Sequence, residues 1–165
     1  MQKLPESGRV RAIGVSNFGI TQLERLLHAP SMKIIPAVNQ VELHPACPSP
    51  NLVEYCKSKG IHCSGYSPLG GSLDSPAHNS EVVMEMGRSY GKSVPQILLA
   101  WGVQSGWSVL PKSVSEERIS GNFEGLKGWR LEEEDVKRLG VEVTVRFKNC
   151  GDDWLPHRVF WGDDE

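Results

Sequence analysis

The sequence predicts an α/β fold built on parallel strands, because short apolar segments alternate four times with segments of helical periodicity. With 165 residues, the chain can bury one hydrophobic core. Right-handed crossovers join parallel strands, and two architectures accommodate four such units: a small doubly wound sheet, or part of a (β/α)8 barrel. A complete barrel takes about 250 residues, so four units correspond to half of one.

The first two units are predicted within residues 10–60. A strand in VRAIGVSNF precedes a helix in ITQLERLLHA, whose isoleucine and leucines recur at helical spacing. The second strand is expected in IIPAVNQVELHP, where period-2 alternation places Val38, Gln40 and Glu42 on one face. Its helix, PNLVEYCKSKG, is expected to end at Gly60.

The third strand, IHCSGYSPLGG, runs into a loop rich in Gly, Pro and Ser that extends to about Asn79. Two helices are expected after it, in SEVVMEMGRSYG and SVPQILLAWGVQSG. WSVLPKS and SEERISGNF form the fourth unit, and RLEEEDVKRLG predicts a charged helix. The tail, residues 140–165, has no clear period; it either covers an exposed sheet edge with Trp154, Phe160 and Trp161 or lacks order.

Composition favours a small-molecule enzyme or binding domain. A formal charge of -2 gives no general attraction to nucleic acid or acidic membranes. The sequence has no apolar run of about 18 residues and no signal-peptide pattern, so we expect a cytoplasmic protein. Neither the cysteines nor the histidines have metal-binding spacing; we expect reduced thiols and no metal site.

Polar residues gather where each predicted strand ends. In parallel α/β folds this edge binds ligands, because loops and helix N-termini converge there. The alternative is that polar residues simply begin where strands stop and cap the following helices. The positions are Ser16 and Asn17, Gln40, Tyr66 and Ser67, and Lys112 and Ser113.

The fourth strand end carries a candidate anion site. Lys112 at the strand end and Arg118 in the next helix can both reach a point above the helix N-terminus, which suits a phosphomonoester. Asn122 lies one turn beyond Arg118 and can bond a ring or sugar beside the phosphate. The alternative is that Ser113 and Glu116 form a capping box, which explains the serine without any ligand.

Tyr66 suggests a flat ligand, because a tyrosine at a strand end before a flexible loop suits stacking on an aromatic ring. The alternative is a tyrosine packed at the sheet rim. Asn17 and Gln40 offer amide groups to a carboxamide opposite such a ring. Together these residues suggest a phosphorylated nucleotide with a planar reactive ring.

The segments GRVRAIGVSNF, PAVNQVELHP, GYSPLG and LPKSVSEERISGNF, in this order, resemble the C-terminal half of an aldo-keto reductase. Members of this family are NADPH-dependent carbonyl reductases built on a (β/α)8 barrel. The resemblance covers residues 8–139, so it implies a single partial domain over residues 1–165 with residues 140–165 as its tail.

The resemblance also implies a cofactor site for NADPH. Residues matching Ser16, Asn17 and Gln40 hold the nicotinamide carboxamide in that family, and the one matching Tyr66 stacks on the nicotinamide. In that family, the residues matching Ser67, Leu69 and Ser72 line the pyrophosphate loop. The residues matching Lys112, Ser113 and Arg118 bind the 2′-phosphate. Asn122 matches a residue that contacts adenine. At position 121 this sequence has glycine, whereas members of the family usually have Glu or Gln at the matching position.

The family's proton-donating Tyr, with its Lys, Asp and His, lies before the segment that matches VRAIGVSNF, so no catalytic residue is assigned here. The resemblance implies reduction of a small carbonyl compound by the full-length relative. The alternatives are a non-catalytic NADP-binding half-barrel or an inactive remnant. Open sheet edges further predict self-association into a homo-oligomer.

Overall fold

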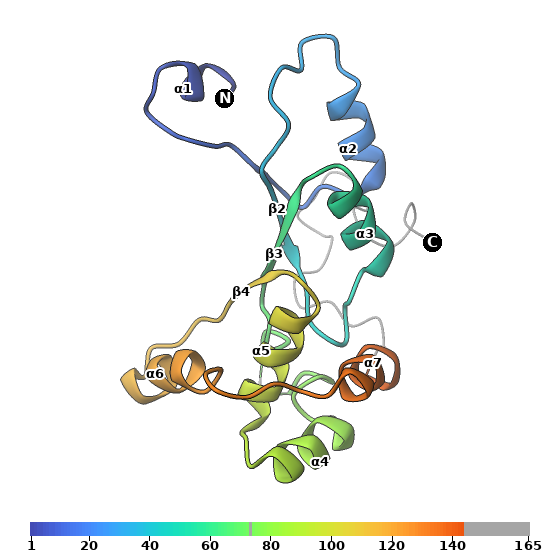
Figure 1. Ribbon diagram of the computed structural model, residues 1–165, viewed down its shortest axis with the longest axis vertical. Coiled ribbons are helices and arrows are strands. Elements are labelled where there is room, and N and C mark those ends of the chain that lie inside the picture. The colour runs from blue at the N-terminus through green and yellow to red at the C-terminus, as the bar shows by residue number, and fades with distance from the viewer. Residues whose placement is uncertain (73, 144–165) are drawn as a thin grey trace. The chain divides into compact units, whose positions relative to one another are not determined.

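A computed structural model of the chain describes residues 1–72 and 74–143 (Figure 1). The prediction for the tail therefore lies outside the described residues, apart from positions 140–143. The described chain forms two compact units. Unit 1 comprises residues 1–41 and 49–64, and unit 2 comprises residues 42–48, 65–72 and 74–143.

The structure confirms the α/β fold. Its parallel strands form one sheet in the order in which they occur in the chain, with helices between them. β1 and β2 pair in parallel, Ser16 opposite Gln40. Chain-order pairing is the arrangement of a (β/α)8 barrel, whereas a doubly wound sheet reverses its order at a switch point. The strands are β1 (Val15–Ser16), β2 (Val38–Glu42), β3 (His62–Tyr66) and β4 (Ser108–Leu110).

Unit 1 contains the first three helices, and its core lies between α2, α3 and the strands. Leu23, Leu52 and Cys56 are the helical side chains that are fully buried there. The short α1 was not expected; Gln2 beside it accepts hydrogen bonds from the amides of Lys33 (2.6 Å) and Ile34 (3.0 Å). The helices are α1 (Lys3–Glu6), α2 (Ile20–Leu27) and α3 (Pro50–Ser58).

Helices α2 and α3 of unit 1 are joined by a hydrogen bond between Tyr55 and Glu24. The phenol donates to Glu24 Oε1 at 2.6 Å, and the Lys59 ammonium lies 5.2 Å from the centre of the tyrosine ring. Burial and the bonded carboxylate raise the pKa of Tyr55 to about 12. The same hydrogen bond lowers the pKa of Glu24. The contact therefore needs a protonated phenol and an ionised carboxylate.

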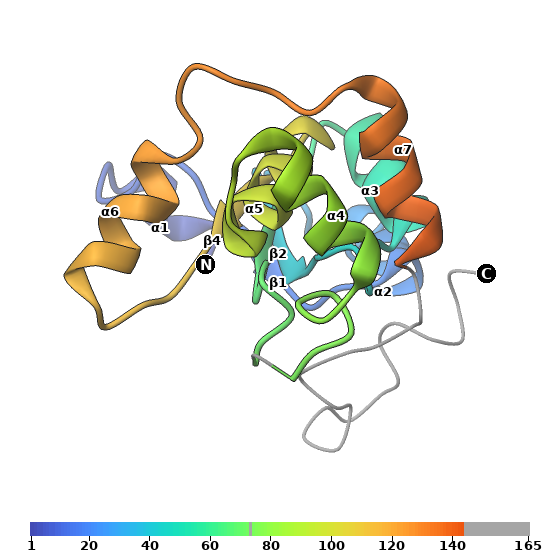
Figure 2. The same cartoon turned by 90° about the horizontal axis from the view of Figure 1, so that it is seen from below.

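Unit 2 is organised around α5, the most apolar helix. Residues 97–102 are all buried, and the helix contacts β4 and the other three helices of the unit. Figures 1 and 2 show α6 and α7 on opposite sides of α5. Because α5 is covered on most sides, it needs no polar face. The helices are α4 (Glu81–Tyr90), α5 (Val94–Gln104), α6 (Glu116–Glu124) and α7 (Glu133–Glu142).

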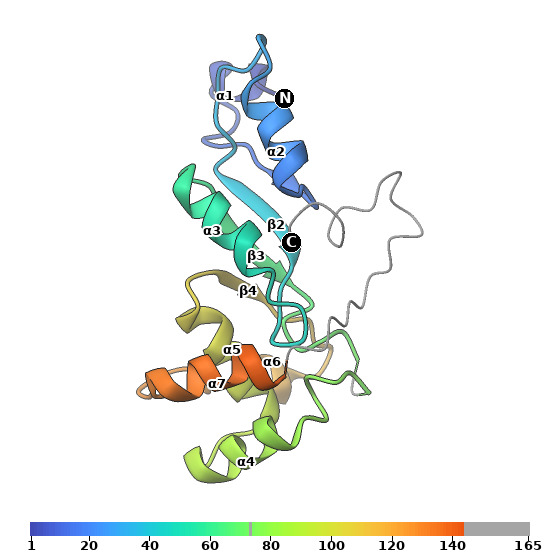
Figure 3. The ribbon, with the colours of Figure 1, turned by 90° about the vertical axis from the view of Figure 1, so that its right-hand side faces the viewer.

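Polar contacts attach α7 to α4 and α5, which lie beside it in Figure 3. Tyr90 donates its phenol proton to Asp135 at 2.5 Å and accepts a hydrogen bond from the Glu132 amide at 3.0 Å. Trp101 donates its indole N–H to the Val136 carbonyl at 3.0 Å. These bonds satisfy buried donors, so the charged helix expected from RLEEEDVKRLG docks through a few specific residues.

The alternation that places Val38, Gln40 and Glu42 on one face of β2 does not give these residues equal burial. Gln40 is exposed, whereas Glu42 is fully buried together with all residues from Val41 to Cys47. Glu42 Oε1 lies 3.0 Å from His44 Nε2, and both side chains are completely buried. A carboxylate in this position is tolerated because the imidazole compensates for its lost hydration.

The Tyr55–Glu24 contact predicts a loss of stability in alkali. A group whose pKa rises on folding contributes stability below its unfolded pKa, near 10 for tyrosine, and loses it as the pH rises toward about 12. We expect Tyr55→Phe to abolish the part of this alkaline loss that is due to Tyr55. The measurement is the urea midpoint at pH about 8 and pH about 11 for both proteins. An equal alkaline decrease in the two proteins would contradict the assignment.

Candidate functional site

The structure brings Ser16, Asn17 and Gln40 together at the carboxyl ends of β1 and β2, within unit 1. The Ser16 hydroxyl and the Asn17 amide both donate to the Gln40 carbonyl, each at 2.9 Å. Asn17 has a φ of 57°, a left-handed conformation that asparagine tolerates. Parallel pairing of Ser16 with Gln40 thus produces this cluster directly.

Asn39 holds the turn that follows this cluster. Its side chain is fully buried; the amide nitrogen donates to the Phe18 carbonyl at 2.8 Å, and the Phe18 amide donates to its oxygen at 3.4 Å. Sequence reasoning missed this residue. The sequence did contain a signal for it: Asn39 alternates with Val41 and so shares its strand face. A polar side chain buried on that face needs hydrogen-bond partners on the backbone.

The loop after β3 belongs to unit 2 and carries four predicted site residues. Its backbone turns sharply, since Ser67 has a φ of 48° and both following glycines have positive φ values, 81° for Gly70 and 84° for Gly71. The Gly70 amide donates to the Ser67 carbonyl at 2.8 Å. Tyr66, Ser67 and Leu69 are half-buried, and Ser72 is exposed. Tyr66 therefore ends β3, Ser67 and Leu69 lie in the tight turn that follows, and Ser72 comes just after it.

Ser75 fixes the shape of this loop. The side chain is completely buried; its hydroxyl donates to the Leu69 carbonyl at 3.3 Å and accepts a hydrogen bond from the His78 amide at 3.2 Å. A Cβ at Gly70 would collide with the Ser75 hydroxyl, so the turn requires glycine. His78, whose amide donates to Ser75, is itself partly buried, and the loss of hydration lowers the pKa of its imidazole.

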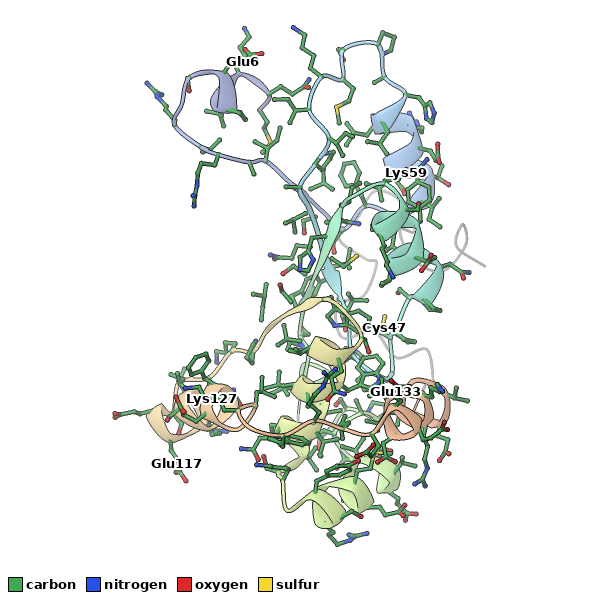
Figure 4. The ribbon with its side chains drawn as sticks, viewed as in Figure 1. Glu6, Cys47, Lys59, Glu117, Lys127 and Glu133 are labelled. Atoms are coloured by element: carbon green, nitrogen blue, oxygen red, sulfur yellow. The ribbon has the colours of Figure 1, made fainter. Side chains whose placement is uncertain are left out.

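At the end of β4, Lys112 and Arg118 are exposed basic side chains. Within the described residues, neither takes part in an ion pair or a side-chain hydrogen bond. Asn122, one turn after Arg118, is half-buried and has no side-chain hydrogen bond in the same part of the chain. Figure 4 shows Glu117 projecting outward from α6. These cations are thus free to bind an external anion.

The capping-box alternative for Ser113 is wrong. Helix α6 begins at Glu116, and its N-cap is Ser115, whose hydroxyl accepts a hydrogen bond from the Arg118 amide at 3.4 Å. Ser113 instead accepts from the Ser115 amide at 3.2 Å, which shapes the turn before the helix. Because Ser115 caps the helix, the Ser113 hydroxyl proton remains available for a ligand.

The tyrosines indicate which chemistry this part of the chain can perform. A tyrosine acts as an acid at neutral pH when a nearby cation lowers its pKa. Tyr55 and Tyr90 instead donate to carboxylates, and the pKa of each phenol is raised by burial first and by the bonded carboxylate second. Neither is suited to donating a proton to a substrate.

The described residues contain neither a metal centre nor a membrane-spanning helix. No group of His, Cys, Asp or Glu there is arranged to hold a metal ion. Likewise, none of the helices in this part of the chain has the length and apolar character needed to cross a bilayer.

Comparison with known proteins identifies one family. The model of the Aldo/keto reductase family matches residues 1–140. A glycerol 2-dehydrogenase (NADP(+)) of Saccharomyces cerevisiae is 45% identical over 166 residues, covering 97% of this chain and 51% of that protein. An aldehyde reductase of the same yeast is 41% identical over 139 residues, covering 84% and 43%.

Solved structures give the same result. A crystal structure of an aldo-keto reductase from a Medee basin deep-sea metagenome library matches with a TM-score of 0.85 and 35% identity, covering 91% of this chain and 54% of that one. The aldose reductase of Schistosoma japonicum matches with a TM-score of 0.84 and 32% identity, covering 97% and 50%. The chain spans about half the length of the relatives it matches.

Ser75 is expected to be the most sensitive position of the loop after β3. Ser75→Ala removes the hydrogen-bond partner of the part-buried Leu69 carbonyl and His78 amide, which costs about 1–3 kcal/mol. Ser89→Ala is the matched control, because that exposed hydroxyl bonds only to its own helix and its removal changes stability by about 0.5 kcal/mol or less. Urea unfolding measures both; equal effects would argue against the role of Ser75.

Proposed function

Because the chain belongs to the aldo-keto reductase family, we propose that it binds NADP(H) and supplies the cofactor-binding half of a carbonyl reductase. The reaction would reduce an aldehyde or a ketone to an alcohol, with the bound cofactor supplying the hydride. One of the similar yeast proteins bears the name glycerol 2-dehydrogenase (NADP(+)), which supports this choice of cofactor.

The observation that carries the proposal is a pair of cations, Lys112 after β4 and Arg118 in α6, that have no ion-pair partner among the described residues. Lys112 and Arg118 lie beside the N-terminus of α6, where free backbone amides also favour an anion. The 2′-phosphate of NADP(H) is a compact dianion that suits two cations and the Ser113 hydroxyl. Asn122 lies one turn along the helix, and an amide side chain suits the edge of the adenine ring.

The remaining residues suit the other parts of the cofactor. In unit 1, the Gln40 side chain and Asn17 offer amide groups to the nicotinamide carboxamide, beside the Ser16 hydroxyl. In unit 2, the half-buried Tyr66 ring suits stacking on the nicotinamide. The turn that follows contains Ser67, Leu69 and Ser72, and its backbone and hydroxyl groups suit the pyrophosphate.

We assign no catalytic residue to this chain. Tyr55 and Tyr90 are bonded to carboxylates, which opposes proton release, and Tyr66 is proposed to stack. A non-catalytic NADP-binding module therefore remains the alternative. Oxidation of NADPH that depends on an added aldehyde distinguishes the two, because a binding module produces none.

The proposal predicts that the chain binds NADPH more tightly than NADH. Arg118→Ala removes a charge-assisted bond to the 2′-phosphate, so we expect it to weaken NADPH binding about 10- to 100-fold and to leave NADH binding unchanged. Arg88→Ala is the control, since this exposed arginine lies on α4. Calorimetric titration of the three proteins with each nucleotide measures the affinities. Equal binding of the two nucleotides by the wild type would overturn the proposal.

We further propose self-association through the exposed apolar face around β4 and α6. Strand β4 is an edge of the sheet, and edge strands are the usual place where a sheet pairs with another chain. The occupant is a second copy of this chain, because two four-stranded sheets supply the eight strands of the barrel fold. The face comprises Leu110 (43% exposed), Val114 (82%), Ile119 (55%) and Phe123 (67%).

This association predicts a dimer by static light scattering. Phe123→Glu places a charge in the apolar face, so the mass is expected to fall to that of a monomer. Val141→Glu is the matched control, because Val141 is 75% exposed on α7, away from this face. A wild-type protein that stays monomeric over a wide concentration range would contradict the dimer.

A further inference from the structure

The side chain of Gln96, in the first turn of α5, contacts two helices of unit 2. Its Oε1 accepts a hydrogen bond from the Ser93 amide at 3.0 Å, which completes the capping box that starts α5. Its Nε2 donates to the Gly121 carbonyl in the middle of α6 at 3.2 Å. One amide group therefore both caps α5 and attaches α6 to it.

Helix α6 has few other attachments. None of its residues is buried, and its apolar side chains Ile119 and Phe123 are more than half exposed. In the described part of the chain, the bond from Gln96 is the only hydrogen bond that reaches α6 from another helix or strand. Gly125, directly after α6, approaches Gln96 so closely that a Cβ would clash with its amide nitrogen. Contact with Gln96 therefore holds this helix.

The attachment point lies within the proposed 2′-phosphate site. Gly121 is next to Asn122 and three residues after Arg118, so any shift of α6 moves both side chains. Gly121 also lowers the intrinsic stability of the helix, while a Cβ there would meet no neighbour. Charge-assisted bonds depend strongly on distance and angle, so an external constraint on α6 matters for phosphate binding.

We propose that Gln96 is a positioning residue for the 2′-phosphate and adenine of NADP(H), and that it thereby contributes to the preference for NADP(H) over NAD(H). The inference rests on the proposed function. Gln96 acts through the Gly121 carbonyl on the placement of Arg118 and Asn122, and touches no part of the cofactor itself.

Gln96→Glu separates this role from helix capping. A glutamate keeps an oxygen that accepts from the Ser93 amide, so the capping box survives, but it cannot donate to the Gly121 carbonyl. We expect weaker binding of NADPH and of adenosine 2′,5′-bisphosphate, each by about 3- to 10-fold, with NADH binding changed less. The ratio of NADPH to NADH affinity is the decisive readout, because a general loss of stability would not change it.

Gln104→Glu provides a matched control on the same helix. The Gln104 amide donates to the Leu131 carbonyl at 2.9 Å and its oxygen accepts from the Leu131 amide at 2.8 Å, so the substitution removes the same kind of bond away from α6. We expect it to leave the affinity ratio unchanged. A ratio that falls equally in both variants would overturn the proposal.

Hydrogen exchange of the α6 amides distinguishes failure of this inference from failure of the proposed function. Faster exchange in α6 of Gln96→Glu, together with a reduced affinity ratio, supports the positioning role. A wild-type ratio in Gln96→Glu overturns it, even if exchange is faster. If the wild type binds neither NADPH nor adenosine 2′,5′-bisphosphate, the proposed function fails, and faster exchange then shows only that Gln96 supports the helix.

Discussion

Parallel pairing in chain order is the constraint on which the other features depend. Since every strand runs in the same direction, each connection crosses back over the sheet, and all the carboxyl ends share one edge. The register of the strands then determines which groups come together. Because Ser16 lies opposite Gln40, the Ser16 hydroxyl and the Asn17 amide both donate to the Gln40 carbonyl. A slip of one residue would turn Gln40 inward and bring Asn39 out to solvent.

Periodicity and turn residues were sufficient to predict most of the fold. The helices in ITQLERLLHA and SVPQILLAWGVQSG and the strand in IHCSGYSPLGG occur where the sequence indicated them. Each of these segments is long or strongly patterned, so local preference and burial agree. The four-residue α1 was not predicted, because so short a helix forms through the bonds from Gln2 to a distant backbone segment.

Residues that act through buried polar contacts could not be predicted. Alternation predicted that Glu42 shares a face with Gln40, but it carries no information about a partner such as His44 two residues later, beside which Glu42 is buried. Ser113 fitted the pattern of a cap, yet the N-cap is Ser115, two residues later, which satisfies the same local rule. Asn39, Ser75 and Gln96 bond to backbone groups that only the folded chain brings near. The candidate site residues could be proposed from the sequence because ligand-binding side chains commonly follow the ends of parallel strands, whereas the residues that support them depend on tertiary contacts.

The close approach of Gly70 to Ser75 has a consequence for how this loop can vary. Any side chain at position 70 would occupy the volume of the Ser75 hydroxyl, and the left-handed backbone of Gly70 opposes a larger residue independently. Accepting a larger residue at 70 would therefore require a different residue at 75 and a different route for the backbone between them. The two positions are therefore coupled in any diversification of the loop, and a library that randomises position 70 while holding Ser75 fixed would recover mostly glycine.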